Sequence, residues 1–196
     1  MTRSVVLVAA FALLTAGCSS EPEELSGFVR TPLPDVGAAS LPDAANGGAD
    51  LAMQAPEGEI LILYFGYTAC PDVCPTTMAD LRAALRELGD DAEKVNVAMA
   101  TIDPERDTDE AITRYVQSFI PGAHALRTDS EQELSAVTDI FGADYGVSVT
   151  DDGTYEVFHT AHLYAIDDAG LLQVTWAFGT EPENIARDLE ILLSGE

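Results

Sequence analysis

The strongest constraint on the fold is an uninterrupted apolar run, ILILYFGY, from Ile60 to Tyr67. A strand with one face in water alternates polar and apolar residues, so a run without alternation predicts a strand that is buried on both faces. The run leads into Cys70 and Cys74, and apolar residues recur at helical spacing after Pro75. The sequence therefore predicts a covered central strand, a cysteine-bearing loop and a helix in immediate succession.

The segments that follow alternate strand and helix. A second apolar run at 95–103 predicts another buried strand, and segments 155–167 and 171–179 flank the turn sequence DDAG and predict a β-hairpin. Apolar residues on one helical face predict three further helices, in segments 108–120, 130–142 and 181–193. This order predicts an α/β thioredoxin-like fold, with a central mixed sheet flanked by helices and an N-terminal irregular extension.

The N-terminus predicts an exported protein with a lipid anchor. Residues 1–17 contain an apolar stretch of about ten residues, which is too short to span a bilayer and typical of a signal peptide. Small residues precede Cys18, as in a bacterial lipobox, and predict lipidation of Cys18; an ordinary secretory cleavage site is the alternative. Residues 18–48 indicate a lipid-anchored tether and lead-in, and 49–196 a single domain. We therefore expect the chain at the cell membrane, facing the extracytoplasmic side.

The formal net charge of −25 argues against a nucleic-acid-binding function, because phosphate groups would meet repulsion over most of the surface. The same charge favours cationic partners or metal ions. An acidic surface also keeps a protein soluble in a saline or exposed environment. Both explanations of the charge remain open.

Cys70 and Cys74 are the only thiols left to the folded domain if Cys18 carries lipid. In a regular helix their Cβ atoms would lie about 5 to 6 Å apart, which is wider than the ~3.8 Å of a relaxed disulfide. Pro75 disfavours helical angles at Cys74, so we expect a loop that either closes on a disulfide or opens around a metal. In both cases the positive end of the helix dipole should lower the pKa of both thiols and favour thiolate.

A metal held by two thiolates needs a further donor, and the three histidines of the chain are His124, His159 and His162. His124 lies in a connecting segment and is expected at the surface. His159 and His162 lie in one predicted strand, where residues three apart point to opposite faces, so at most one of them faces the cysteine loop. A strand histidine is more often a hydrogen-bonded structural residue than a ligand. The spacing assigns no Asp or Glu as a further ligand.

Three motifs make the sequence similar to the Sco (SenC/PrrC-type) family of copper-handling proteins: YFGYTACPDVCPTTM, TIDPERDT and VFHTAHLYAIDDAG. The resemblance covers about residues 58–195. It implies a thioredoxin-like domain that binds one copper ion, Cu(I) or Cu(II), through Cys70, Cys74 and His159. The implied role is maturation of the dinuclear copper site of cytochrome c oxidase. The oxidase subunit with that site is then the expected partner, together with another copper chaperone or a thiol reductant.

The sequence departs from the family pattern at two positions near the implied ligands. Ala69 stands where many members have a histidine beside the first cysteine, and Phe158 replaces a commonly acidic residue before His159. The second departure bears on the orientation of His159, because ligating histidines usually lean on a hydrogen-bond acceptor. The anchor is also expected to be a lipid, where the family usually has a membrane helix. The middle motif is expected to build a polar turn at the end of a strand rather than to act directly, through Asp103, Pro104, Arg106 and Asp107.

The sequence is compatible with two functions of different classes, a metallochaperone and an oxidoreductase. A copper metallochaperone suits the donor set, because two thiolates and an imidazole bind Cu(I) and also hold Cu(II). The alternative is a dedicated thiol-disulfide oxidoreductase that reduces an extracytoplasmic partner through a redox disulfide between Cys70 and Cys74. A generic oxidoreductase is disfavoured, because the cysteine spacing is one residue longer than C-x-x-C and no proline occurs between Pro121 and Pro182. Zinc would lack the usual fourth structural ligand, and a peroxidase would have only Thr68 at a suggestive distance from the cysteines.

Overall fold

The computed structural model describes residues 24–150, 153 and 155–195. The predicted signal peptide and the predicted lipidation site, Cys18, lie outside these residues. No helix in the described part combines the length and the apolar composition needed to cross a membrane. In chain order the elements are β1 (Ser40–Asp43), the 3-10 helix η1 (Ala44–Asn46), β2 (Ala49–Ala52), β3 (Ile60–Gly66), α1 (Val73–Leu88), η2 (Gly89–Lys94), β4 (Val95–Thr101), α2 (Asp109–Phe119), β5 (His124–Leu126), α3 (Glu131–Phe141), β6 (Tyr145–Val149), β7 (Tyr155–His159), β8 (His162–Ile166), β9 (Leu172–Ala177) and α4 (Pro182–Ser194).

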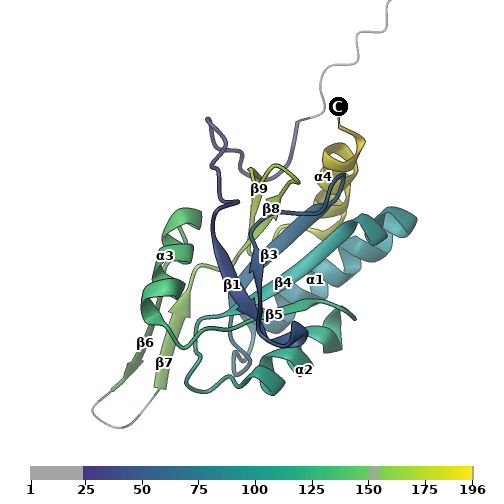
Figure 1. Cartoon of the computed structure of the whole chain (residues 1–196). Helices are drawn as coiled ribbons and strands as arrows, with labels where there is room; N and C mark the ends of the chain where they lie inside the picture. Colours follow the sequence, from purple (N-terminus) through teal and green to yellow (C-terminus); the bar gives the residue numbers. More distant parts are fainter. Residues whose placement is uncertain (1–23, 151–152, 154, 196) are drawn as a thin grey trace, which may run out of the picture.

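A seven-stranded mixed sheet forms the centre of the molecule, in the order β2-β1-β5-β4-β3-β8-β9 (Figure 1). β3, β4 and β5 run parallel, whereas β8 runs antiparallel to β3 and β1 runs antiparallel to β5. All seven residues of β3 are buried, as its apolar run predicts. Because parallel strands end at the same edge of a sheet, the loops that follow β3 and β4 lie next to each other.

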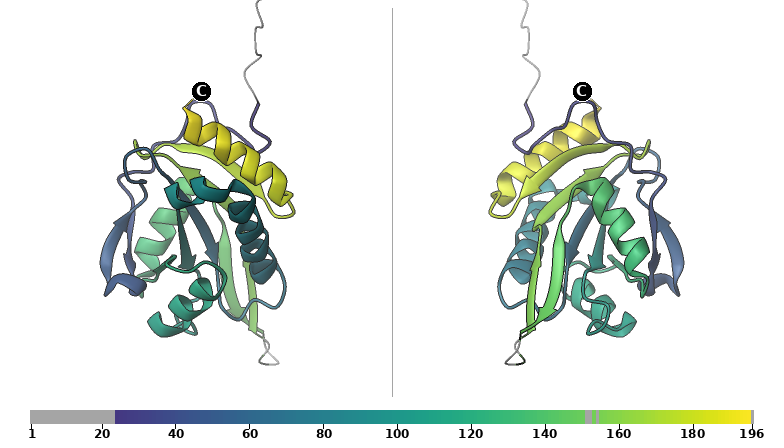
Figure 2. Two further views of the ribbon diagram at one scale, coloured as in Figure 1. Left: turned by 90° about the vertical axis from the view of Figure 1, so that its right-hand side faces the viewer. Right: turned by 90° about the vertical axis from the view of Figure 1, so that its left-hand side faces the viewer.

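Helices cover both faces of this sheet. α1, α2 and α4 lie on one face and α3 lies on the other (Figure 2). Side-chain caps start two of them: Thr108 accepts a hydrogen bond from the backbone N–H of Ala111, and Ser130 accepts one from Glu133. Gly142 ends α3 in the left-handed conformation that glycine adopts most easily. The predicted helices are all present, and the mixed sheet flanked by helices is confirmed.

Part of the segment predicted as an irregular lead-in joins the sheet. β1 pairs with both β2 and β5. Further upstream, Phe28 forms a bridge to Thr175 and Asp35 forms one to Leu171, so this segment runs along the β9 edge. The partner of β1 in β5 lies more than 80 residues further along the sequence, and the partners of Phe28 and Asp35 at the β9 edge lie more than 130 residues further along. A composition rich in Pro, Gly and Ser does not reveal them.

The segment predicted as one strand at 155–167 consists of two strands. β7 pairs with β6 in a separate two-stranded sheet, whereas β8 belongs to the main sheet and forms the predicted hairpin with β9. The chain leaves β7 at Thr160, whose N–H donates to the carbonyl oxygen of Asp144 at 2.7 Å. The expectation that His159 and His162 lie on opposite faces of one strand is therefore wrong, because they belong to different strands in different sheets.

Candidate metal centre

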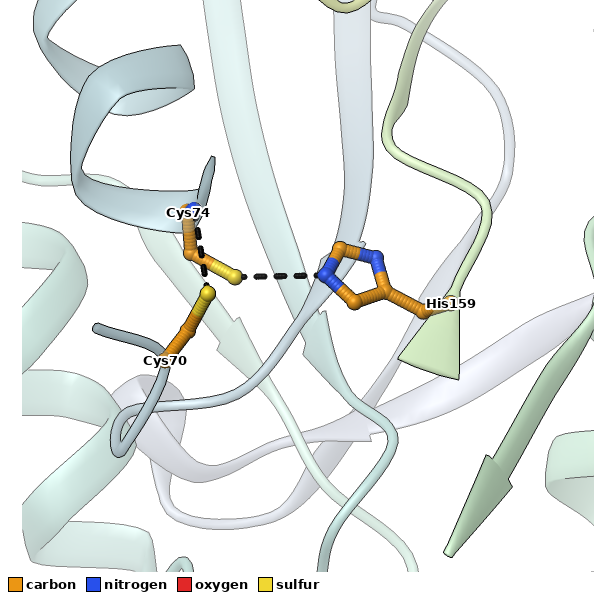
Figure 3. Close-up of side chains that lie close together, drawn as sticks. All are labelled: Cys70, Cys74 and His159. Atoms are coloured by element: carbon orange, nitrogen blue, oxygen red, sulfur yellow. Dashed lines mark hydrogen bonds between the residues drawn. The ribbon is translucent and has the colours of Figure 1, made fainter. Parts of the chain in front are cut away.

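Three candidate ligands meet at the edge of the sheet where β3 ends (Figure 3). Sγ of Cys70, Sγ of Cys74 and a ring nitrogen of His159 all lie within 4.8 Å of one another. Sγ of Cys74 is 3.4 Å from Nε2 of His159, and the backbone N–H of Cys74 donates to Sγ of Cys70 at 3.2 Å. Both cysteines are free thiols. No other group of three such metal-binding side chains occurs among the residues that the structure describes.

Each candidate ligand comes from a different element of the fold. Cys70 lies in the loop after β3, Cys74 in the first turn of α1 and His159 at the end of β7. The prediction that Cys74 lies in a loop is wrong, because α1 begins at Val73. Pro75 does not prevent this start, because the first N–H groups of a helix have no acceptor within the helix and a missing one leaves no bond unmade.

Gly66, the last residue of β3, lets Cys74 approach the sheet closely. A Cβ atom at this position would lie 2.6 Å from Cε1 of Tyr64 and 3.1 Å from Sγ of Cys74. Both separations are shorter than ordinary carbon contacts, so a larger residue would displace the thiol or the ring. The glycine therefore sets the depth at which Cys74 sits.

A buried carboxylate fixes the loop that carries Cys70. Asp107 accepts hydrogen bonds from the backbone N–H of Thr68 at 3.0 Å and from the hydroxyl of Thr101 at 2.6 Å, and the Thr68 hydroxyl also donates to it. Asp107 thus joins the cysteine loop to the end of β4. The predicted polar turn of the middle motif is present, and its Asp107 holds the loop that carries Cys70. The Thr68 hydroxyl donates to this carboxylate and not to a thiol, so Thr68 does not support a peroxidase function for the cysteines.

The two thiols differ in their electrostatic environment. Partial burial would raise the pKa of Cys70, but hydrogen bonds, above all from the backbone N–H of Cys74, hold it below its ordinary value. Burial raises the pKa of Cys74 to about 12. The expectation that both thiol pKa values are lowered is therefore wrong for Cys74, where burial outweighs the helix dipole. A metal that binds Cys74 at neutral pH must displace its proton.

Two aromatic rings pack against His159. The rings of Tyr64 and Tyr67 meet its imidazole edge-on, with centroids 5.9 and 5.8 Å away. Burial lowers the pKa of His159 and so favours the neutral imidazole, which is the form that binds metals. Nδ1 of His159 is buried and has no hydrogen-bond partner within the described part of the chain. Phe158 is 60% exposed and supplies no acceptor for it.

The donor set fits a single transition-metal ion. Bonds of about 2.3 Å to sulfur and 2.0 Å to nitrogen place the donors of a three- or four-coordinate ion about 3.5 to 4 Å apart. The observed separations reach at most 4.8 Å, so a small closure brings the donors to that spacing. Two sulfurs and one imidazole are the donors that copper and zinc prefer. A four-coordinate ion held by these three side chains would keep one position for an incoming group.

The other two histidines lie outside this cluster. His124 is half-buried in β5 and its Nδ1 lies 2.7 Å from Oδ2 of the buried Asp43. The expectation of a surface position is wrong, because β5 joins the sheet beside β1. His162 begins β8, with its ring 6.1 Å from that of Tyr164.

The sequence motifs named the three candidate ligands and placed Arg106 and Asp107 in a polar turn, but they assigned no role to Gly66 or Tyr67. Gly66 and Tyr67 stand inside the first motif, and Arg106 and Asp107 inside the second. Their positions within the two motifs indicate that these residues belong to the site. The contacts of Arg106 with Tyr67 and of Asp107 with Thr68 join the loops after β3 and β4, and only the folded chain brings these loops together.

The SCO1/SenC family model matches residues 44–194. An SCO2-like protein of Rickettsia prowazekii is 34% identical over 115 residues, which are 58% of this chain and 56% of that protein. The mitochondrial SCO2 homologue of Bos taurus is 35% identical over 133 residues, which are 65% of this chain and 49% of that protein. The chain thus spans about half the length of these curated relatives.

Solved structures extend the likeness to three dimensions. The copper-bound ScoI of Bradyrhizobium japonicum is 34% identical with a TM-score of 0.66, and the match covers 78% of this chain and 95% of that one. The copper-bound ScoI of Arabidopsis thaliana is 25% identical with a TM-score of 0.71, covering 82% and 99%. These likenesses confirm the predicted thioredoxin-like fold. Since the family model matches more than half of the sequence, the chain belongs to the SCO1/SenC family.

Proposed function

We propose that the chain is a copper metallochaperone, which binds one copper ion and acts in maturation of the dinuclear copper site of cytochrome c oxidase. The main support is the meeting of Cys70, Cys74 and His159 within 4.8 Å. The matching structures from Bradyrhizobium japonicum and Arabidopsis thaliana hold copper. Membership of the SCO1/SenC family favours the same cargo here.

The three ligands have different parts in this function. Cys70 is partly exposed and is the donor that an incoming ligand reaches first, whereas Cys74 is fully buried. Two thiolates alone hold Cu(I) in near-linear coordination, but Cu(II) also requires the imidazole of His159. The site therefore accepts both oxidation states of the cargo, with His159 as the donor that distinguishes them.

Copper transfer to the purified, metal-free oxidase domain with the dinuclear site tests this proposal. The copper-loaded chain should produce the absorption spectrum of the filled dinuclear site while a chelator removes free copper. Cys70→Ser should abolish transfer. Failure of the wild-type chain to fill the domain, or equal filling by Cys70→Ser, would contradict the proposal.

We further propose that a lipid on Cys18 holds the chain at the extracytoplasmic face of the membrane. The support is the short apolar stretch within residues 1–17 and the small residues before Cys18. Another copper chaperone or a thiol reductant then supplies the copper or keeps the thiols reduced. Intact mass of the chain from the membrane fraction should show an acylated N-terminal cysteine, and an unmodified chain in the medium would contradict the anchor.

The unequal exposure of the two thiols favours one second function, a dedicated thiol-disulfide oxidoreductase. The partly exposed Cys70 thiolate would attack a disulfide sulfur of the partner, which forms a mixed disulfide and releases one partner thiolate. Cys74, after losing its proton, would attack Sγ of Cys70 and release the second partner thiol. Two electrons thus pass to the partner and a Cys70–Cys74 disulfide remains. Reduction of a disulfide-bonded oxidase domain, without reduction of insulin, would support this function.

A further inference from the structure

Arg106 lies between two tyrosine rings beside the metal centre. Its guanidinium carbon is 3.8 Å from the ring centroid of Tyr155 and 5.7 Å from that of Tyr67. Its Nε donates to the carboxylate of the buried Asp103. The hydroxyl of Tyr155 donates to the other oxygen of that carboxylate at 3.1 Å. We call Asp103, Arg106 and Tyr155 the latch.

The latch joins two parts of the chain that share no sheet. Asp103 and Arg106 lie in the turn between β4 and α2, and Tyr155 is the first residue of β7. β7 pairs only with β6 within the described residues, and the two strands extend away from the main sheet (Figure 1). An isolated two-stranded hairpin has little stability of its own. Side-chain contacts must therefore hold this hairpin against the domain.

His159 lies at the opposite end of β7 from the latch, about 13 Å along the strand at the usual rise per residue. There the N–H of Thr160 donates to the carbonyl oxygen of Asp144 at 2.7 Å, which continues the β6–β7 pairing by one residue, and the chain enters β8 of the main sheet at His162. With both ends held, β7 places Nε2 of His159 3.4 Å from Sγ of Cys74. Tyr67 provides a second connection, because its ring contacts both Arg106 and the imidazole of His159.

We infer, on the basis of the proposed function, that the latch positions His159 and thereby sets the preference of the centre between Cu(II) and Cu(I). With the latch closed, the imidazole stays beside the two sulfurs and all three donors are available. With the latch broken, β7 and the Tyr67 ring that Arg106 contacts are both less restrained, so the imidazole of His159 turns away from the sulfurs more easily. The two thiolates that remain suit Cu(I) and bind Cu(II) poorly. The latch residues are positioning residues, since none of them belongs to the ligand cluster.

Three variants open the latch in different ways. Tyr155→Leu removes both the stacked ring and the hydroxyl, and Tyr155→Phe removes only the hydroxyl. The double variant Asp103→Asn/Arg106→Gln removes the ion pair without leaving a buried carboxylate unpaired. Arg82→Gln is the control for the loss of one arginine side chain, because Arg82 lies at an exposed position on α1.

Competition titration with chelators, under oxidising conditions for Cu(II) and anaerobically for Cu(I), gives both affinities for each variant. Tyr155→Leu and the double variant should weaken Cu(II) binding about three- to thirtyfold, the range expected for a lost cation–π contact. Cu(I) binding should change by less than about twofold, since the thiolate pair is untouched. Tyr155→Phe should act in the same direction with a smaller effect, and Arg82→Gln should change neither affinity.

Two further measurements separate positioning from general destabilisation. In a His159→Ala background, Tyr155→Leu should cause no additional loss of Cu(II) affinity. In the metal-free chain, the β7 amides should exchange faster in Tyr155→Leu while those of β3 do not. Equal losses of Cu(I) and Cu(II), or an unchanged Cu(II) affinity in a folded latch variant, would overturn the inference. If the wild-type chain binds neither ion, the proposed function fails, and the amide exchange still shows whether the latch holds β7.

Discussion

At the scale of single residues, the two cysteines have the same chemistry and different surroundings. Cys70 is partly exposed and accepts a backbone hydrogen bond, whereas Cys74 packs against the end of β3 with no exposed surface. Gly66 creates the space for Cys74, because any Cβ at that position would lie 3.1 Å from its sulfur. The environment of the deeper thiol is thus set by a residue that carries no functional group.

Gly66→Ala should destabilise the metal-free chain by about 1–3 kcal/mol, the usual range for an overpacked core. It should also weaken copper binding, because the added methyl group displaces the Cys74 sulfur or the Tyr64 ring. Urea unfolding and copper titration measure the two effects. Gly47→Ala is the control: this glycine has φ of 67° and open space around it, so alanine should strain the backbone and leave copper affinity unchanged. Unaltered copper binding in Gly66→Ala would contradict the role of the glycine.

At the scale of the elements, the site depends on the contact between the loops after β3 and β4. Asp107 makes that contact through Thr68 and Thr101. Asp107→Asn should lower the free energy of unfolding by about 1–3 kcal/mol, because an amide nitrogen cannot accept the hydrogen bonds of a carboxylate oxygen. Copper affinity should fall as well, since the loop that carries Cys70 loosens.

Ser130→Ala provides the comparison for Asp107→Asn. Loss of this helix cap should destabilise the chain by about 1 kcal/mol, and the α3 start contributes no ligand to the metal centre. Copper affinity should therefore stay at the wild-type value. If both variants weaken copper binding in proportion to their loss of stability, Asp107 has no specific role in positioning the loop.

Elements with a local pattern could be predicted from the sequence, and those that depend on distant partners could not. β3 and the helix after it each carry their own apolar pattern. β1 lies in a segment of loop-like composition, and its partner β5 is more than 80 residues away. At the site, strand spacing alone did not decide whether His159 or His162 faces the cysteines, and the family resemblance indicated His159. The high pKa of Cys74 could not be foreseen, because its burial arises from packing against β3 rather than from its place in α1.

At the scale of the whole molecule, Asp188 ties the N-terminal segment to α4 and β9. This buried carboxylate accepts hydrogen bonds from the backbone N–H groups of Ser26 and Gly27, from the Ser26 hydroxyl at 2.6 Å and from Nε1 of Trp176 at 2.8 Å. Burial alone would raise the pKa of Asp188, but these hydrogen bonds hold it below its ordinary value. The carboxylate therefore stabilises the fold above its unfolded pKa of about 3.9, and this contribution is lost as the pH falls through the folded pKa.

Asp188→Asn should lower the free energy of unfolding at pH 7 by about 1–3 kcal/mol. The difference from wild type should shrink as the pH falls below about 4, because the wild-type carboxylate then becomes protonated. Urea unfolding at several pH values measures this difference. Glu190→Gln removes the same charge from an exposed position of α4 and should have little effect at any pH. A difference that stays constant down to pH 2 would argue against the depressed pKa.

Copper titration of His159→Ala and His162→Ala tests the central claim most directly, because the two histidines differ in their distance from the thiols and not in their chemistry. His159→Ala should weaken Cu(II) binding by more than about tenfold and alter the thiolate-to-copper absorption. Cu(I) binding should suffer less, since Cys70 and Cys74 hold it together. His162→Ala should leave both affinities and the spectrum nearly intact, with circular dichroism to verify that both variants fold. Loss of the Cu(II) spectrum in His162→Ala and its retention in His159→Ala would contradict the account.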